Sequence, residues 1–91
     1  MPTQFYVLYA VYGALVGSQG ITQAAPVTSQ LQAQLNNSPT GVVTINNITM
    51  GGDPSPNNLK QFGALVQVNG TILPFACQEH QTINFGYTAG S

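Results

Sequence analysis

The chain has 91 residues, which is enough for one domain with a modest core, so residues 1–91 are treated as a single domain. Only Asp53, Lys60 and Glu79 carry a full charge at neutral pH, and the net charge is −1. Such a chain has no electrostatic attraction to phosphate backbones or to anionic lipids, which argues against nucleic acid and membranes as partners.

The first predicted element is a strand over Gln4–Tyr12, because Tyr, Phe and Val dominate it and no charge interrupts it. The glycines that follow are expected to end this strand. The stretch Phe5–Gly17 has the length of a signal-peptide hydrophobic region, but no Lys or Arg precedes it and it holds three tyrosines. It is also shorter than the roughly 20 apolar residues of a membrane span. We therefore expect a mature strand; a cytoplasmic or non-classically secreted protein is favoured, and the compartment stays open.

One helical pattern follows, in which Val27, Leu31 and Leu35 recur at a spacing of four residues with glutamines between them. Pro26 is expected in the first helical turn, where its fixed φ is favourable and its missing N–H has no consequence. The run Asn36–Pro39 is a stop signal. A helix of about ten residues is marginal alone, so its apolar stripe is expected to pack on a sheet.

A short strand is predicted over Val42–Ile45, and Gly51–Asn58 is predicted to be a rigid loop because it holds two glycines and two prolines. Within that loop, Asp53 is expected to close a turn through side-chain-to-backbone hydrogen bonds. Lys60 is expected to pair with Asp53 or Glu79 at the surface, where such a pair contributes little to stability.

The clearest local signal is Asn69-Gly70, the favoured pair for a type I′ turn, between two apolar runs at Gln61–Val68 and Thr71–Cys77. This turn sets the register of a hairpin. One side of the hairpin then carries Val68 opposite Thr71, Val66 opposite Leu73, Ala64 opposite Phe75, and Phe62 opposite Cys77. Pro74 cannot donate a ladder hydrogen bond, so its strand is expected at a sheet edge or at a bulge. A final strand is predicted over Thr82–Phe85.

The predicted order, β-α-β-β-β-β, is typical of a β-rich α+β domain. We expect a single antiparallel-rich sheet, or a small sandwich, of about five strands with one short helix.

A motif in the second half of the chain supports a family resemblance. It consists of Gly51-Gly52-Asp53-Pro54 with Pro56, followed by Lys60, the Asn69-Gly70 hairpin and Glu79. With these residues, most of the chain resembles a small β-rich domain found at the C-terminus of a DnaJ-like co-chaperone subfamily and as free-standing fungal and bacterial copies. That family has no known function, so the resemblance implies a β-rich module without catalytic residues. The chain departs from the family at His80, where a glycine is expected.

Catalysis has little support, because the chain holds one His, one Cys and two carboxylates. Cys77 and His80 could form a nucleophile and its base, with Asp53 as the orienting group. The hairpin register instead places Cys77 on the core side, where a thiol is usually inert. The spacing Cys77-x-x-His80 is half of a zinc site at most. We therefore expect no enzyme, no cofactor and no metal site.

Polar neutral residues make up much of the chain: 32 of the 91 residues are Gln, Asn, Thr or Ser. One hypothesis is a lectin-like module in which Asp53, Asn57 and Asn58 hydrogen-bond the hydroxyls of a neutral carbohydrate and Tyr87 stacks on it. The alternative from the residues is that this loop is only a rigid turn.

Self-association is the second part of this hypothesis. The first strand is uncharged and proline-free, the profile of a segment that pairs with itself. Its candidate contact residues are Phe5, Tyr6, Tyr9 and Tyr12. A homo-oligomer would cover them, although the helix and hairpin could also do so within one chain. The alternative function is a self-assembling structural protein, a fibre or surface subunit, without a ligand.

Overall fold

Six strands and one helix make up the fold within residues 4–86. A computed structural model describes residues 4–86. The elements are β1 (Phe5–Val16), β2 (Ile21–Pro26), α1 (Thr28–Asn36), β3 (Val42–Thr44), β4 (Gln61–Val68), β5 (Thr71–Gln78) and β6 (Thr82–Asn84). Four of them form an antiparallel sheet in the order β2-β1-β4-β5, and β3 pairs with β6 in a second, two-stranded sheet. The β-rich α+β class is therefore confirmed, with one strand more than expected.

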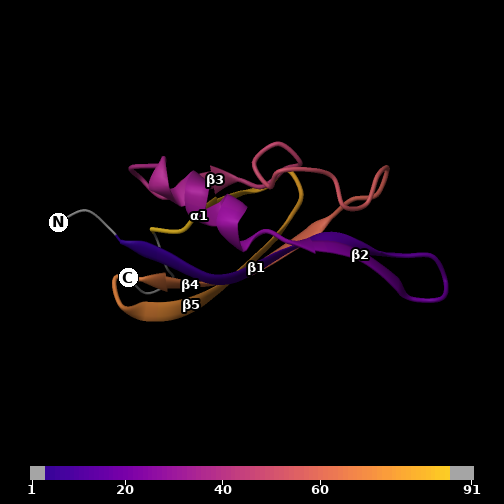
Figure 1. Ribbon diagram of the computed structural model, residues 1–91, viewed down its shortest axis with the longest axis horizontal. Helices are drawn as coiled ribbons and strands as arrows, with labels where there is room; N and C mark the ends of the chain where they lie inside the picture. Colours follow the sequence, from indigo (N-terminus) through magenta and orange to yellow (C-terminus); the bar gives the residue numbers. More distant parts are fainter. Residues whose placement is uncertain (1–3, 87–91) are drawn as a thin grey trace.

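The large sheet has two faces with different surroundings. Helix α1 and strand β3 lie over one face, which we call the inner face, and the β1–β2 hairpin extends beyond this layer (Figure 1). The opposite side of the four strands, which we call the outer face, has no second layer from residues 4–86. The core therefore lies between the inner face and the layer of α1, β3 and β6.

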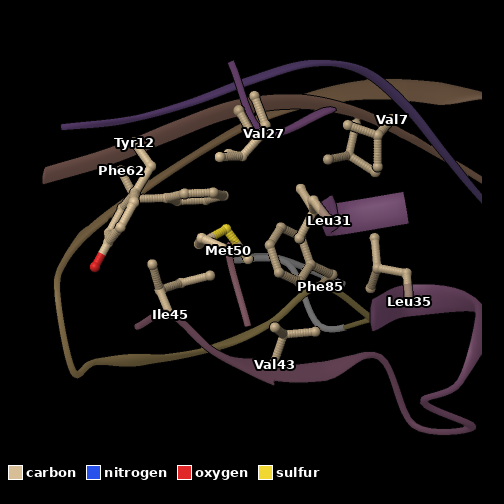
Figure 2. Close-up of a cluster of buried hydrophobic side chains, with 13 residues drawn as sticks. Val7, Tyr12, Val27, Leu31, Leu35, Val43, Ile45, Met50, Phe62 and Phe85 are labelled. Carbon is tan, nitrogen blue, oxygen red and sulfur yellow. The ribbon is translucent and has the colours of Figure 1, made fainter. Parts of the chain in front are cut away.

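The core is apolar and centred on Phe85 (Figure 2). The Phe85 ring packs edge-on against Phe62, with centroids 6.5 Å apart, and obliquely against Phe75 at 4.6 Å. The predicted helical stripe supplies Val27, Leu31 and Leu35, all of them buried. The marginal helix is thus held by the sheet beneath it, as its single apolar stripe requires.

Strand β1 is longer than predicted, and β2 was not predicted. Gly13 does not end the strand: it pairs with Ala24 of β2, and a Cβ added there would lie 2.3 Å from the Ala24 Cα. The glycine therefore permits a close approach of two strands. The chain reverses later, where Gly17 and Gly20 take φ of +72° and +71°.

The expected place of Pro26 in the first helical turn is wrong. Pro26 is the last residue of β2, where it pairs with Val11, and Val27 precedes the first helical residue. The missing N–H is tolerated there because β2 is an edge strand of the sheet. The helix is tied to β1 instead by the Val27 N–H, which donates to the Ala10 carbonyl over 2.8 Å.

A β-bulge interrupts the pairing of β1 with β4 between Val7 and Tyr9. The Val7 N–H donates to Gln32 Oε1 of the helix over 2.8 Å, and Gln32 Nε2 donates to the Phe5 carbonyl over 3.0 Å. The extra residue shifts the alternation of side chains by one. As a result Tyr6 and Tyr9, three positions apart, both lie on the outer face.

The β4–β5 hairpin has the predicted register, from Val68 opposite Thr71 to Phe62 opposite Cys77. Asn69 and Gly70 have φ of 49° and 92°, the pair of positive values that a type I′ turn requires. Pro74 lies in β5, which is an edge strand as expected.

Candidate functional site

The outer face of the large sheet presents only uncharged side chains within residues 4–86. Its strands contribute Tyr6, Tyr9, Val11, Gly13 and Leu15 from β1, Thr22, Ala24 and Pro26 from β2, Gln61, Gly63, Leu65 and Gln67 from β4, and Ile72, Pro74, Ala76 and Gln78 from β5. The alternation of side chains along each strand places them there. The three charged residues of the chain all lie outside this face.

Four large apolar side chains lie exposed on one half of the outer face, and Leu15 lies exposed on the other half. Tyr6 is 63% exposed, Tyr9 53%, Leu65 45% and Ile72 54%. Tyr9 lies opposite Leu65, and Leu65 lies opposite Pro74, so one apolar row crosses β1, β4 and β5. In the neighbouring row Gln67 lies between Tyr6 and Ile72. We call Tyr6, Tyr9, Leu65 and Ile72 the ridge. Exposed apolar patches of this kind mark sites of association.

Two of the four residues predicted for self-association lie in the ridge, and two do not. Phe5 is half-buried and packs against the core. Tyr12 is fully buried on the inner face, and its hydroxyl donates to Asn47 Oδ1 over 2.7 Å. Burial raises the pKa of Tyr12 above its ordinary range, and the negative charge of Glu79 raises it further. Only Tyr6 and Tyr9 of this set can therefore meet a partner directly.

Lys60, which directly precedes β4, is the centre of a buried ion cluster. The side chain is only 2% exposed, and Nζ lies 2.8 Å from Asp53 Oδ1 and 3.4 Å from Glu79 Oε1. Nζ also donates to the carbonyls of Ser55 at 3.0 Å and Asn58 at 2.7 Å. The expectation of a surface pair is therefore wrong, because the Gly51–Asn58 loop folds over the lysine and removes it from water.

The cluster fixes the charge state of its members. The hydrogen bond from Lys60 holds the pKa of Asp53 below its ordinary value, and that same bond raises the pKa of Lys60. Burial acts to raise the pKa of Glu79, but the Lys60 backbone N–H and ammonium outweigh it, so the net shift is downward. The backbone of Lys60 also exchanges hydrogen bonds with Glu79: its N–H donates to Oε1 over 3.1 Å, and its carbonyl accepts the Glu79 N–H over 2.8 Å. The cluster thus fastens the loop to the end of the β4–β5 hairpin.

Three of the four residues predicted to hold a carbohydrate, Asp53, Asn57 and Asn58, share one loop, but two of these three are committed to its structure. Asp53 accepts hydrogen bonds from Lys60 and from the Ser55 N–H, so its predicted turn-closing role is seen. The Asn58 side chain donates to Ser55 Oγ and to the Pro56 carbonyl. Asn57 is exposed, with a positive φ of 67°. Tyr87 lies outside the described residues.

Beside this loop is a small hollow of about 240 Å³. It is bounded by Val27, which precedes α1, by Gln30 of α1, and by Met50, Gly51, Gly52 and Asp53. About a third of the Asp53 side chain stays exposed here. A carboxylate, an amide and backbone groups thus meet at one concave surface.

Cys77 and His80 differ in their exposure to solvent. Cys77 is half-buried on the core side, as the hairpin register predicts, and burial raises the pKa of its thiol. His80 is 73% exposed and lies 3.6 Å from Glu79 Oε2. Within residues 4–86 no three His, Cys, Asp or Glu residues are grouped so that they could hold a metal ion. No helix of this part of the chain is long and apolar enough to span a membrane.

Comparison of the chain with protein-family models, with curated proteins and with solved structures found no match.

Proposed function

We propose that this chain is a non-enzymatic, β-rich module that associates with further copies of itself through the outer face of its large sheet. The observation that carries this proposal is the ridge: four large, well-exposed apolar side chains on a sheet face without a charged residue. An apolar sheet face normally packs against a second layer, and residues 4–86 supply such a layer only on the inner face.

The size of the outer face fits a dimer interface. Four strands with a spacing of about 4.8 Å and eight residues with a rise of about 3.3 Å cover a projected area on the order of 500 Å². Because the side chains protrude from the sheet, the accessible area is larger than this projected area. It therefore approaches the roughly 800 Å² that each partner buries in a standard interface. A second copy stacked on the whole outer face would therefore bury an area that approaches that of a standard interface.

The chemistry of the face favours a second copy over a charged partner. A charged partner would lose water around its ionised groups and find no opposite charge on this face, which is costly. A neutral partner of the same shape incurs no such penalty. With a net charge of −1, two copies also repel each other only weakly.

Leu65→Gln tests the proposal, because Leu65 lies at the centre of the ridge and its change keeps the strand uncharged. The matched control is Ile48→Gln, since Ile48 is 89% exposed and lies outside the large sheet. By sedimentation velocity, the wild type and Ile48→Gln are expected to be oligomeric and Leu65→Gln monomeric. A monomeric wild type at high micromolar concentration, or an unchanged Leu65→Gln oligomer, would overturn the proposal. Electron microscopy of the wild type then separates closed oligomers from indefinite fibres.

A lectin-like site for a neutral carbohydrate is the second candidate function. The observation in its favour is the 240 Å³ hollow, where the part-exposed Asp53 carboxylate and the Gln30 amide offer hydrogen bonds to hydroxyl groups. A glycan array tests it with the wild type and with Gln30→Ala, which changes an exposed helix residue without disturbing the Lys60 cluster. Glycan binding that Gln30→Ala weakens supports this function, and absence of binding by the folded, assembled wild type excludes it.

A further inference from the structure

A hollow of about 330 Å³ lies on the outer face, next to the ridge. Its lining comes from β1, β2 and β4, and it includes Gly13, Gly63 and Ala24, with Val11 and Leu15 at its sides. Gly63 faces Val11 across the β1–β4 pairing, and Gly13 faces Ala24 across the β1–β2 pairing. Because three neighbouring strands place glycine or alanine here, the sheet has a trough where other sheets carry side chains. We call this region the trough.

The two glycines of the trough differ in what the fold requires of them. Gly13 is required, because a Cβ there would collide with the backbone of Ala24. Gly63 is not: a Cβ would find its nearest neighbours, Phe75 O and Val11 Cγ1, at 4.0 Å, and φ is not positive. A glycine inside a strand destabilises it by roughly 0.5–1 kcal/mol relative to alanine. The monomer would therefore be more stable with a side chain at position 63, and the open space needs another explanation.

We infer that the trough receives the Tyr9 ring of a second copy, an inference that rests on the proposed self-association and specifies its geometry. Tyr9 and Gly13 lie on the same face of β1, four residues and about 13 Å apart. A twofold axis between two stacked outer faces, perpendicular to β1 near Val11, places each Tyr9 over the other copy's Gly13. One interface then contains the same contact twice, as a twofold dimer requires.

The chemistry of the trough fits a tyrosine. Its lining residues carry no charge and include the amide of Gln61 and the hydroxyl of Thr22 at its edges. A tyrosine ring is apolar over its face and polar at its hydroxyl, so it can bury the ring against glycine and alanine while the hydroxyl reaches an amide or water. Tyr is enriched at the centres of interfaces for this reason.

Gly63→Val is the decisive variant, because it fills the trough without a backbone penalty. The expected result is a folded protein, with an unfolding temperature at or above that of the wild type, whose dimer dissociation constant rises at least tenfold. Ala24→Leu fills the trough from β2, where Ala24 is exposed, and is expected to act in the same way should Gly63→Val fold poorly. Tyr9→Ser is expected to weaken the dimer similarly, and Tyr9→Phe to weaken it less.

Combination of variants tests whether the two sites meet. If Tyr9 occupies the trough, Gly63→Val combined with Tyr9→Ser weakens the dimer little more than either change alone. Should folded Gly63→Val and Ala24→Leu remain as dimeric as the wild type while Leu65→Gln dissociates, the trough inference fails and the proposed self-association stands. A monomeric wild type, or an unaffected Leu65→Gln oligomer, would reject both.

Discussion

The backbone at His80 makes the substitution His80→Gly a quantitative test of the fold. His80 has φ of 77°, a left-handed conformation that a residue with a Cβ adopts at a cost of roughly 1–2 kcal/mol. The His80 N–H donates to the Ile45 carbonyl over 2.6 Å, and this hydrogen bond holds the turn after β5 to the loop after β3. A glycine at position 80 has the same backbone N–H and keeps the bond. The same position is the one at which the family resemblance predicts a glycine.

The expected gain follows from three contributions. Glycine removes the backbone strain, which stabilises the fold by roughly 1–2 kcal/mol. It also gives the unfolded chain more conformational freedom, which destabilises the fold by roughly 0.5–1 kcal/mol. The contact of His80 with Glu79 at 3.6 Å adds little, since the imidazole is 73% exposed. From the middle of each range, the variant should be more stable by about 0.75 kcal/mol, which for a domain of this size raises the unfolding temperature by about 3–6 °C.

Thermal and urea unfolding at neutral pH measure this gain. Asn57→Gly is the matched control, because Asn57 also has a positive φ, of 67°, but asparagine tolerates this conformation. The control should therefore gain clearly less than His80→Gly. An unfolding temperature of His80→Gly at or below that of the wild type would show that the backbone strain argument is wrong.

Three further predictions concern the buried polar groups and the outer face. Because the folded-state pKa values of Asp53 and Glu79 lie below their ordinary values of 3.8 and 4.5, the unfolded chain binds more protons at low pH. The free energy of unfolding should be constant near neutral pH and should decrease as the pH falls below these ordinary values towards the lower folded-state pKa values. Urea titrations at several pH values measure this decrease, and Lys60→Met should reduce it. Tyr12→Phe removes the hydroxyl that donates to Asn47 and should lower the free energy of unfolding by about 1 kcal/mol at an unchanged denaturant slope. The proposed oligomer should keep its mass between low and physiological salt, since the outer face through which we propose it forms has no charges to screen. Dissociation over that range in sedimentation would contradict an uncharged interface.

Local signals allowed the β4–β5 hairpin to be predicted in full, because Asn69-Gly70 determines both the turn and the register. The β1–β2 hairpin was missed for the opposite reason. Gly13 has the appearance of a strand terminus in the sequence, and only the partner strand shows that it permits a close approach. Pro26 is equally compatible with a helix start and with the end of an edge strand, and the edge position of β2 decides between them.

Parts of the candidate site depend on contacts that are distant in the sequence. The burial of Lys60 requires Asp53 and Glu79, which come from two separate turns, and a charged residue beside a turn is ordinarily exposed. Strict alternation along β1 would place Tyr6 and Tyr9 on opposite faces, and the sequence has no signal for the bulge that unites them. The ridge therefore became visible only in the folded structure.

The buried position of Lys60 has a practical consequence, because Lys60 is the only lysine and the chain has no arginine. Trypsin cleaves after these two residue types, so its one site in the sequence is enclosed in the folded protein. Digestion then requires the Gly51–Asn58 loop to open or the whole domain to unfold, and its rate reports the population of that open state. Ubiquitin ligases and amine-directed crosslinkers meet the same barrier at this side chain. Modification of Lys60 therefore reports how often the protein opens, and not which parts of its folded surface are accessible.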